Sequence, residues 1–240
     1  MALAFAGCVH AIAPRPSGSS PPVQASAARL LRAPELVVHV EWLAGAAPSD
    51  AELEGAREFL LRYARPERGV RIVQGGELPS LEPPDVPVPD AVLWQVARTH
   101  RVPPDPTGAA TIRLLFVPRL ASDGSGRGER GRAFPSESFA AIGQGGVRDA
   151  TFLTVRSREV SRFVVQHELG HLLGLVSNPA HDRDGHCTNP TCILYAGPDL
   201  RAVLANFWWG VLGRLPESLD ADCEHDLEAL RAGRGTPDRG

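Results

Sequence analysis

Lysine is absent from this 240-residue sequence, and all 25 basic residues are arginine. Together with 24 glycines and 22 prolines, this bias is typical of a GC-rich genome, and we give it no functional weight. The net charge of −3 provides no excess of positive charge, which argues against a nucleic-acid partner. No run of about 18 apolar residues occurs, so the sequence predicts no transmembrane helix. With 43% hydrophobic residues, the composition is that of a globular protein of one or two domains.

Sulfur is also scarce, because the only methionine is Met1 and the four cysteines are Cys8, Cys187, Cys192 and Cys223. Cys8 ends an apolar run, and an apolar run that closes in Ala-Gly-Cys resembles the cleavage box of a bacterial lipoprotein signal. In such signals the lipid is attached to the cysteine. We therefore expect an exported protein, in the periplasm or at the cell surface, anchored through a lipid on Cys8. The alternatives are an incidental cysteine in a frayed terminus and a cytoplasmic protein.

The order of elements is predicted from hydrophobic patterning and from turn residues. Residues 1–33 are interpreted as a truncated lipoprotein signal and a Pro/Ser-rich tether, residues 34–232 as the catalytic domain and 233–240 as a disordered tail. Strands are expected at 36–43, 69–74, 111–117, 138–143 and 150–155. Helices are expected at about 50–64, from Asp90, at 199–212 and from Asp220 or Asp222 to about Arg231. Residues 121–132 are expected to form a flexible surface loop with solvated arginines.

The motif that carries chemistry is His167-Glu168-Leu169-Gly170-His171, an H-E-x-x-H sequence inside an apolar helical pattern. Positions i and i+4 lie on one face of a helix, so His167 and His171 can offer two imidazoles to one metal ion. A charged Glu168 in a mostly buried helix also needs a reason, and a divalent cation supplies one. Catalytic zinc typically keeps three protein ligands and an open position for water, with the glutamate as general base. The alternative is a core helix that contains the motif by chance.

The motif continues to Gly174 and resembles that of the metzincin clan of zinc peptidases, H-E-x-x-H-x-x-G-x-x-H. The third histidine of that pattern is replaced by Ser177. Further along, His186-Cys187-x4-Cys192-x-Leu194 resembles the H-C-x4-C-x-M sequence of the archaemetzincin branch. The resemblance implies that residues 177–185 are an insertion and that His186 is the third zinc ligand. His181 is the alternative third ligand.

Two further features of the clan can be placed on this sequence. The clan has a Met-turn beneath the metal, and Leu194 stands at that position, where a leucine of similar volume can support the site by packing. Tyr195 follows it, and in some relatives a tyrosine near this turn stabilises the oxyanion. The resemblance also implies that substrate lies antiparallel to an edge strand, for which we expect the segment near 138–146.

The three later cysteines correspond to a second, structural zinc site of the archaemetzincin branch. One cysteine of that set is missing here, and Asp220 and His225 are the candidates to replace it. A second zinc could then be held by Cys187, Cys192 and Cys223 with one of these residues. In an oxidising compartment Cys187 and Cys192 could instead form a disulfide. Because we expect export, we favour the disulfide and a single zinc ion.

We therefore predict an α+β fold with a twisted, mainly parallel sheet, an active-site helix and a smaller helical C-terminal subdomain that closes the cleft from below. The predicted function is that of a monomeric, zinc-dependent endopeptidase acting on a peptide or protein substrate. His167, His171 and His186 bind Zn²⁺, and Glu168 is the general base. The alternatives are a zinc hydrolase acting on cell-wall peptides and a non-catalytic zinc-binding module.

Overall fold

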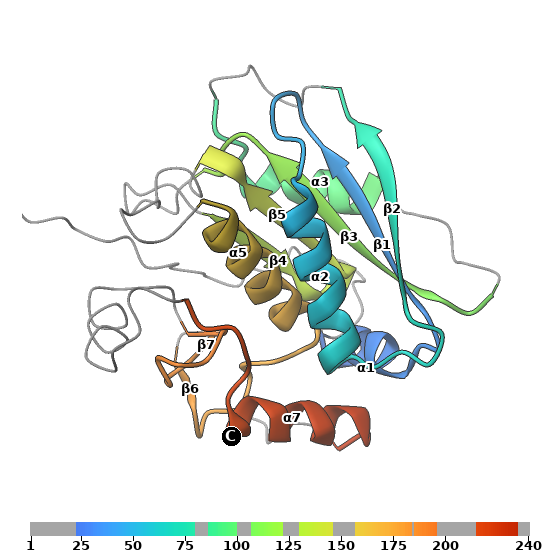
Figure 1. Cartoon of the computed structure of the whole chain (residues 1–240), viewed down its shortest axis with the longest axis vertical. Helices are drawn as coiled ribbons and strands as arrows, with labels where there is room; N and C mark the ends of the chain where they lie inside the picture. Colours follow the sequence, from blue (N-terminus) through green and yellow to red (C-terminus); the bar gives the residue numbers. More distant parts are fainter. Residues whose placement is uncertain are drawn as a thin grey trace, which may run out of the picture.

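A five-stranded sheet forms the centre of the molecule in the order β2-β1-β3-β5-β4 (Figure 1). The computed structural model describes residues 23–79, 86–99, 107–121, 130–145, 157–183, 185–195 and 215–234. The strands are β1 (Leu36–Trp42), β2 (Val70–Glu77), β3 (Ala110–Val117), β4 (Gly131–Phe134) and β5 (Phe139–Gly143). β4 is antiparallel to β5, whereas the other neighbouring strands are parallel. This arrangement confirms the predicted, mainly parallel sheet.

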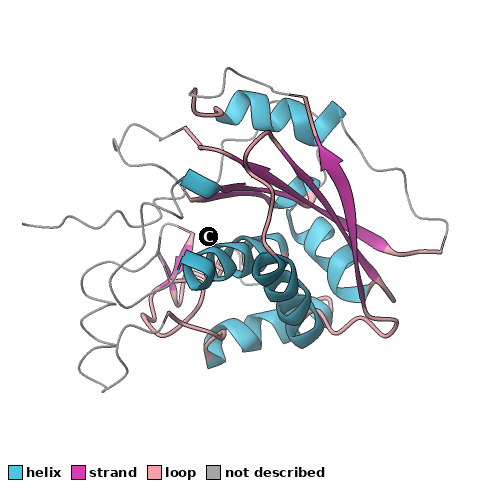
Figure 2. Cartoon of the chain, turned by 45° about the horizontal axis from the view of Figure 1, so that its top comes forward, coloured by secondary structure: helices cyan, strands magenta, loops and turns pink. Residues whose placement is uncertain are grey.

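Helices cover both faces of the sheet (Figures 1 and 2). α2 (Asp50–Tyr63) and α5 (Ser157–Leu172) lie on one face, and α3 (Asp90–Thr99) lies on the other. Alternate residues of each strand point to opposite faces, which explains the two apolar clusters. On β3, Ile112 and Leu114 join the larger cluster under α2 and α5, whereas Leu115 joins the cluster under α3. The strands and helices expected in these regions are present with end shifts of a few residues.

The edge strand β4 was missed by the sequence prediction, which assigned residues 121–132 to a surface loop. Gly131 to Phe134 instead pair with β5, and Arg132 is only 3% exposed. The guanidinium of Arg132 lies 3.4 Å from a carboxylate oxygen of Asp90 at the start of α3. The hydrophobic pattern could not reveal this strand, because it is only four residues long and its buried, paired arginine looks in the sequence like a solvated loop residue. The tip of the expected loop, residues 122–129, lies outside the described residues.

β5 is not the edge strand that we expected near residues 138–146. It lies between β3 and β4, because β3 pairs with it in parallel from Arg113 and β4 closes its other side. Among the described residues β4 has no strand on its outer side. The two edges of the sheet are β2 and β4, and β4 is the edge that lies against α5, the helix that carries the H-E-x-x-H motif.

Helix α1 (Val23–Arg32) lies within the segment that we expected to be a tether. Its buried residues Ala27, Leu30 and Leu31 follow helical spacing and pack on the core, and the hydroxyl of Ser26 donates a hydrogen bond of 2.9 Å to the carbonyl of Ser136. The Ala and Ser content that suggested a linker is equally compatible with a short amphipathic helix. Cys8, the expected strand at 150–155 and the expected helix at 199–212 lie outside the described residues.

The chain after α5 forms a smaller unit below the sheet (Figure 1). Its elements are the two-residue strands β6 (Asp182–Arg183) and β7 (His186–Cys187) and the helix α7 (Ala221–Arg231). Asp220 caps α7, as predicted, by accepting a hydrogen bond of 2.9 Å from the amide of Cys223. Where the structure is described, no helix has the length and apolar character needed to span a bilayer.

α5 ends in a hydrogen-bonded turn that frees the chain to reverse. Gly174 has a φ of +82°, its amide donates to the carbonyl of His171, and the amide of Leu175 donates to that of Gly170. This pair of bonds is the Schellman motif, in which glycine takes the left-handed position. The motif glycine therefore stops the helix one turn after the second histidine.

We expect Gly174→Ala to destabilise the protein by more than the left-handed backbone alone would cause, which is about 1–2 kcal/mol. The added Cβ would lie 2.7 Å from Cβ of Ala27, so a close contact adds to the backbone strain. Gly45→Ala is the matched control, because Gly45 has a φ of +75° with no atom within 4 Å of the added Cβ. Denaturant unfolding measures the free energy of unfolding of both variants. Equal losses in the two variants would contradict a close contact between the added Cβ at position 174 and Ala27 of α1.

Candidate metal centre

The last turns of α5 bring the two motif histidines together inside the protein. His167 and His171 are both buried, and their Nε2 atoms are 3.1 Å apart. Two nitrogens that bind one tetrahedral zinc ion at its usual bond length lie about 3.3 Å apart. The spacing of the two imidazoles therefore fits a shared metal ion.

The third imidazole of this group belongs to His186, on β7. Its ring centroid lies 5.3 Å from that of His167 and 5.3 Å from that of His171. One ring nitrogen from each of the three buried histidines falls within 4.8 Å of the others. The structure thus brings together the three residues that we expected to bind zinc. Within the described residues the group offers three ligands, which is the number that a catalytic zinc site typically takes from the protein.

The orientation of His167 is fixed by a hydrogen bond from the opposite side of its ring. Nδ1 lies 2.8 Å from the carbonyl oxygen of Ile193, and a carbonyl can only accept, so Nδ1 carries the proton. Nε2 is then left with a lone pair that faces the other two histidines. This is the usual arrangement behind a metal-binding histidine, in which the outer hydrogen bond selects the tautomer.

Glu168 is fully buried, with 0% of its surface exposed, next to His167 on the same turn of α5. Its carboxylate lies against Gly131 of β4. A carboxylate therefore lies between the histidine-bearing helix and the edge strand β4.

Leu194 takes the position of the methionine in the Met-turn resemblance. It is completely buried, and its Cδ2 atom lies 2.5 Å from the point where a Cβ on Gly170 would be. The leucine is thus in close contact with the turn of α5 between the two histidines. Tyr195 forms a β-bridge with Cys187, and its expected contribution to oxyanion binding stays a prediction.

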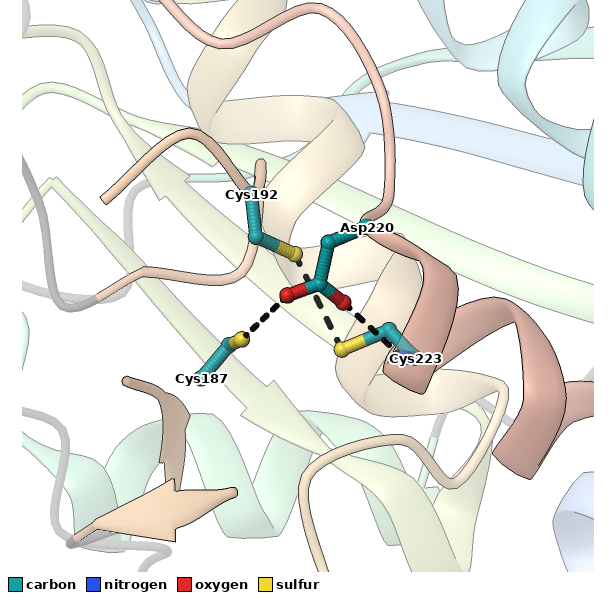
Figure 3. A group of neighbouring side chains, drawn as sticks. All are labelled: Cys187, Cys192, Asp220 and Cys223. Carbon is teal, nitrogen blue, oxygen red and sulfur yellow. Dashed lines mark hydrogen bonds between the residues drawn. The ribbon is translucent and has the colours of Figure 1, made fainter. Parts of the chain in front are cut away.

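A second group of possible ligands consists of Cys187, Cys192, Asp220 and Cys223 (Figure 3). All three cysteines are free, so the disulfide that we favoured between Cys187 and Cys192 is not formed. Cys192 lies 3.7 Å from Cys223, and the Cys187 thiol donates a 3.2 Å hydrogen bond to Asp220. The tertiary structure brings α7 against the turn, so that Cys223 and Asp220, both named as candidates from the sequence, lie beside Cys187 and Cys192.

The donor set of this group fits a closed, structural metal site. Two sulfurs bound to one tetrahedral zinc ion are about 3.8 Å apart, close to the Cys192–Cys223 distance. Of the two residues proposed to replace the missing cysteine, Asp220 lies in the group, whereas His225 is exposed on α7. Three thiols and a carboxylate complete four ligands, and four-coordinate sulfur-rich sites are typical of structural zinc.

Contacts among the three thiols of this cluster shift their pKa values in opposite directions. Hydrogen bonds with Cys187 and Cys223 lower the pKa of Cys192 to about 4. The hydrogen bond with Cys192 raises the pKa of Cys187 to about 12, and contacts with Cys187 and Cys192 raise that of Cys223. One thiolate is therefore already favoured, and a divalent cation would favour ionisation of the others.

His181, our alternative third ligand, lies outside the three-histidine group. It is 8% exposed, and its Nε2 atom is 2.9 Å from a carboxylate oxygen of Asp226 on α7. Asn178 donates to the other oxygen of Asp226, so the inserted loop is held on α7 at two points. Burial acts to lower the pKa of His181, but hydrogen bonds with Cys187 and Asp226 raise it overall. The same loop contains Asp182 and Asp184. Asp182 lies on β6 and pairs with Cys187 of β7, and Asp184 lies outside the described residues.

The two groups are joined through neighbouring residues at two places. His186 is followed directly by Cys187, and Cys192 is followed by Ile193, whose carbonyl orients His167. Backbone amides also donate to the sulfurs, from Asn189 to Cys187 and from Leu194 to Cys192. An ordered sulfur cluster therefore fixes the position of His186. It also fixes the carbonyl of Ile193, which is the hydrogen-bond partner of His167.

No family model matches the sequence, and no curated protein matches it. Several solved structures resemble the fold, among them the following two. Archaemetzincin from Methanopyrus kandleri is 17% identical, with a TM-score of 0.55 over 83% of this chain and 97% of that protein. A zinc-dependent peptidase from Methanocorpusculum labreanum is 20% identical, with a TM-score of 0.54 over 79% of this chain and 99% of that protein.

These likenesses, together with the sheet and the histidine-bearing helix, define a metzincin-like fold. Within that class the fold is of the archaemetzincin type. At these identities the likeness establishes the architecture, and the chemistry has to be argued from the chain's own side chains.

We expect Leu194→Ala to lower the free energy of unfolding by about 2–5 kcal/mol, because it leaves a cavity against the buried turn of α5. Leu194→Met keeps nearly the same volume, and we expect it to cost less than about 1.5 kcal/mol. Urea unfolding of the two variants provides the comparison. A methionine variant as unstable as the alanine variant would show that the position needs the branched shape of leucine.

Proposed function

We propose that this chain is a zinc-dependent endopeptidase. The observation that carries the proposal is the convergence of three buried imidazoles, His167, His171 and His186, beside the buried carboxylate of Glu168. A purely structural zinc site has no use for an extra buried carboxylate, whose burial costs free energy. The open three-ligand form supports a catalytic role.

A zinc ion held by these histidines would polarise the scissile carbonyl and make water a nucleophile at neutral pH. Glu168 would accept the proton of the attacking water and pass it to the leaving amine. Glu168 directly follows His167 in the chain, and its carboxylate lies against Gly131 of β4. Burial excludes bulk water, which strengthens each of these electrostatic contacts.

The substrate would bind as an extended strand along β4. The outer side of β4 has no partner strand among the described residues, so its amides and carbonyls can pair with a peptide. Since Gly131 of β4 contacts Glu168, a peptide paired there would pass close to the general base. Recognition through main-chain atoms is compatible with a peptide or protein substrate of varied sequence.

We further propose a second, structural zinc ion on Cys187, Cys192, Asp220 and Cys223, in place of the disulfide that we first favoured. Free thiols, their spacing and the adjacent carboxylate support this assignment. Export and lipid attachment at Cys8 stay proposals from the sequence, with a cytoplasmic enzyme as the alternative. A hydrolase acting on cell-wall peptides would use the same site.

Glu168→Gln is expected to lower peptidase activity by about 100- to 10,000-fold, which is the usual contribution of a general base. The amide keeps the size of the side chain but cannot accept the proton. Because Glu168 is not one of the proposed zinc ligands, the zinc content should not change. Cleavage of an unfolded protein substrate and metal analysis on the same sample test this prediction.

The control for that experiment is Glu159→Gln, which removes an exposed carboxylate from the first turn of the same helix. It should keep full activity, and a chelator should abolish activity in both the control and the unmodified protein. Zinc-loaded protein that is inactive before any substitution would sink the peptidase proposal and favour a non-catalytic binding module.

Two zinc ions per chain are expected in the reduced protein carrying Cys8→Ser, which removes the one cysteine outside both groups. Cys223→Ser should lose one ion and keep the ion on the histidines, whereas His186→Ala should show the reverse preference. Elemental analysis with a thiol count provides the measurement. One zinc ion together with two oxidised thiols in the parent would restore the disulfide interpretation.

A further inference from the structure

Gly131 and Glu168 are in unusually close contact across the junction of β4 and α5. A Cβ placed on Gly131 would lie 2.3 Å from Oε1 of Glu168 and 2.7 Å from both Cδ and Cγ. Real Cβ atoms essentially never approach another heavy atom closer than 3.0 Å. The carboxylate of Glu168 therefore occupies the space that any other residue at position 131 would fill.

The backbone of Gly131 gives no independent reason for glycine. Its φ lies outside the left-handed range in which side chains are strained, and it pairs regularly with Ile142 in the sheet. Glycine also loses more conformational freedom on folding than alanine does, so at an ordinary strand position it is the less favourable of the two. The contact with Glu168 is thus the feature of the structure that requires the missing side chain.

The strand cannot easily move away to relieve such a contact. The carbonyl of Arg130 accepts a 2.7 Å hydrogen bond from Gly143, and Phe134 is buried against the α3 face of the sheet. A glutamate side chain, in contrast, can turn about several single bonds. An added methyl group at position 131 would therefore displace the carboxylate rather than β4.

We propose that Gly131 is a positioning residue that sets where the Glu168 carboxylate lies relative to the three histidines and to a peptide on β4. The inference rests on the proposed peptidase function and adds a specific constraint to it. Because the same residue lies on the strand that would pair with substrate, base and substrate are held at a fixed separation by one backbone segment. Such positioning matters, since a displacement of about 1 Å can cost about 100-fold in rate.

The kinetic test is Gly131→Ala in the zinc-loaded protein. We expect kcat to fall by about 100-fold, with KM and zinc content unchanged, because the ligands and the strand edge keep their places. The matched control is Ala140→Val, which adds bulk to β5, the strand next to β4, inside the larger core cluster. This control should keep kcat, even if it lowers the melting temperature as much as the glycine variant does.

A stability cycle tests the contact without any activity measurement. Gly131→Ala should lower the melting temperature of the parent, but in a Glu168→Ala background it should be neutral or stabilising, because the crowding atoms are gone. An unchanged kcat in Gly131→Ala, or the same loss of melting temperature in both backgrounds, would overturn the inference. Failure of the proposed function looks different: the parent would lack peptidase activity, while the cycle would still report the coupling.

Discussion

The hydrogen bond between His167 Nδ1 and the carbonyl of Ile193 joins the two parts of the molecule on which the site depends. α5 belongs to the layer that covers the sheet, whereas Ile193 belongs to the turn of the smaller lower unit. The bond sets the tautomer of His167, and the packing of Leu194 against Gly170 holds the turn in place behind it. Without this junction, the H-E-x-x-H sequence would supply two histidines and no defined third ligand.

The sulfur cluster supports that junction from below. Cys187 follows His186 directly and Cys192 precedes Ile193, the hydrogen-bond partner of His167, so the chain has little freedom to move one site without the other. The inserted segment 177–185 lengthens the path to His186, but His181 and Asn178 anchor it to Asp226 of α7. The insertion is therefore compatible with a compact site, because α7 supplies the fixed surface on which the loop is fastened.

Space is as important as bonding in this site. Three histidines and a glutamate share a buried volume that also contains the edge strand, and Gly131 and Gly170 are the positions where neighbours come closest. Close packing of this kind restricts each polar group to one place, which is the preorganisation that catalysis requires.

The resemblance to the archaemetzincin motif pointed to His186 as the third histidine of the group, and the sequence by itself determined the local features: the histidine spacing on a helix, the glycine that ends it and most strands of the sheet. These follow from periodicity and turn chemistry, which act over a few residues. Only the tertiary structure decided that Arg132 lies in an edge strand, that residues 23–32 form a packed helix and that Asp220 rather than His225 joins the thiols. Each of these depends on contacts between segments far apart in the chain, where a buried ion pair, an apolar helix face or the direction of a capped helix outweighs the preference of the local sequence.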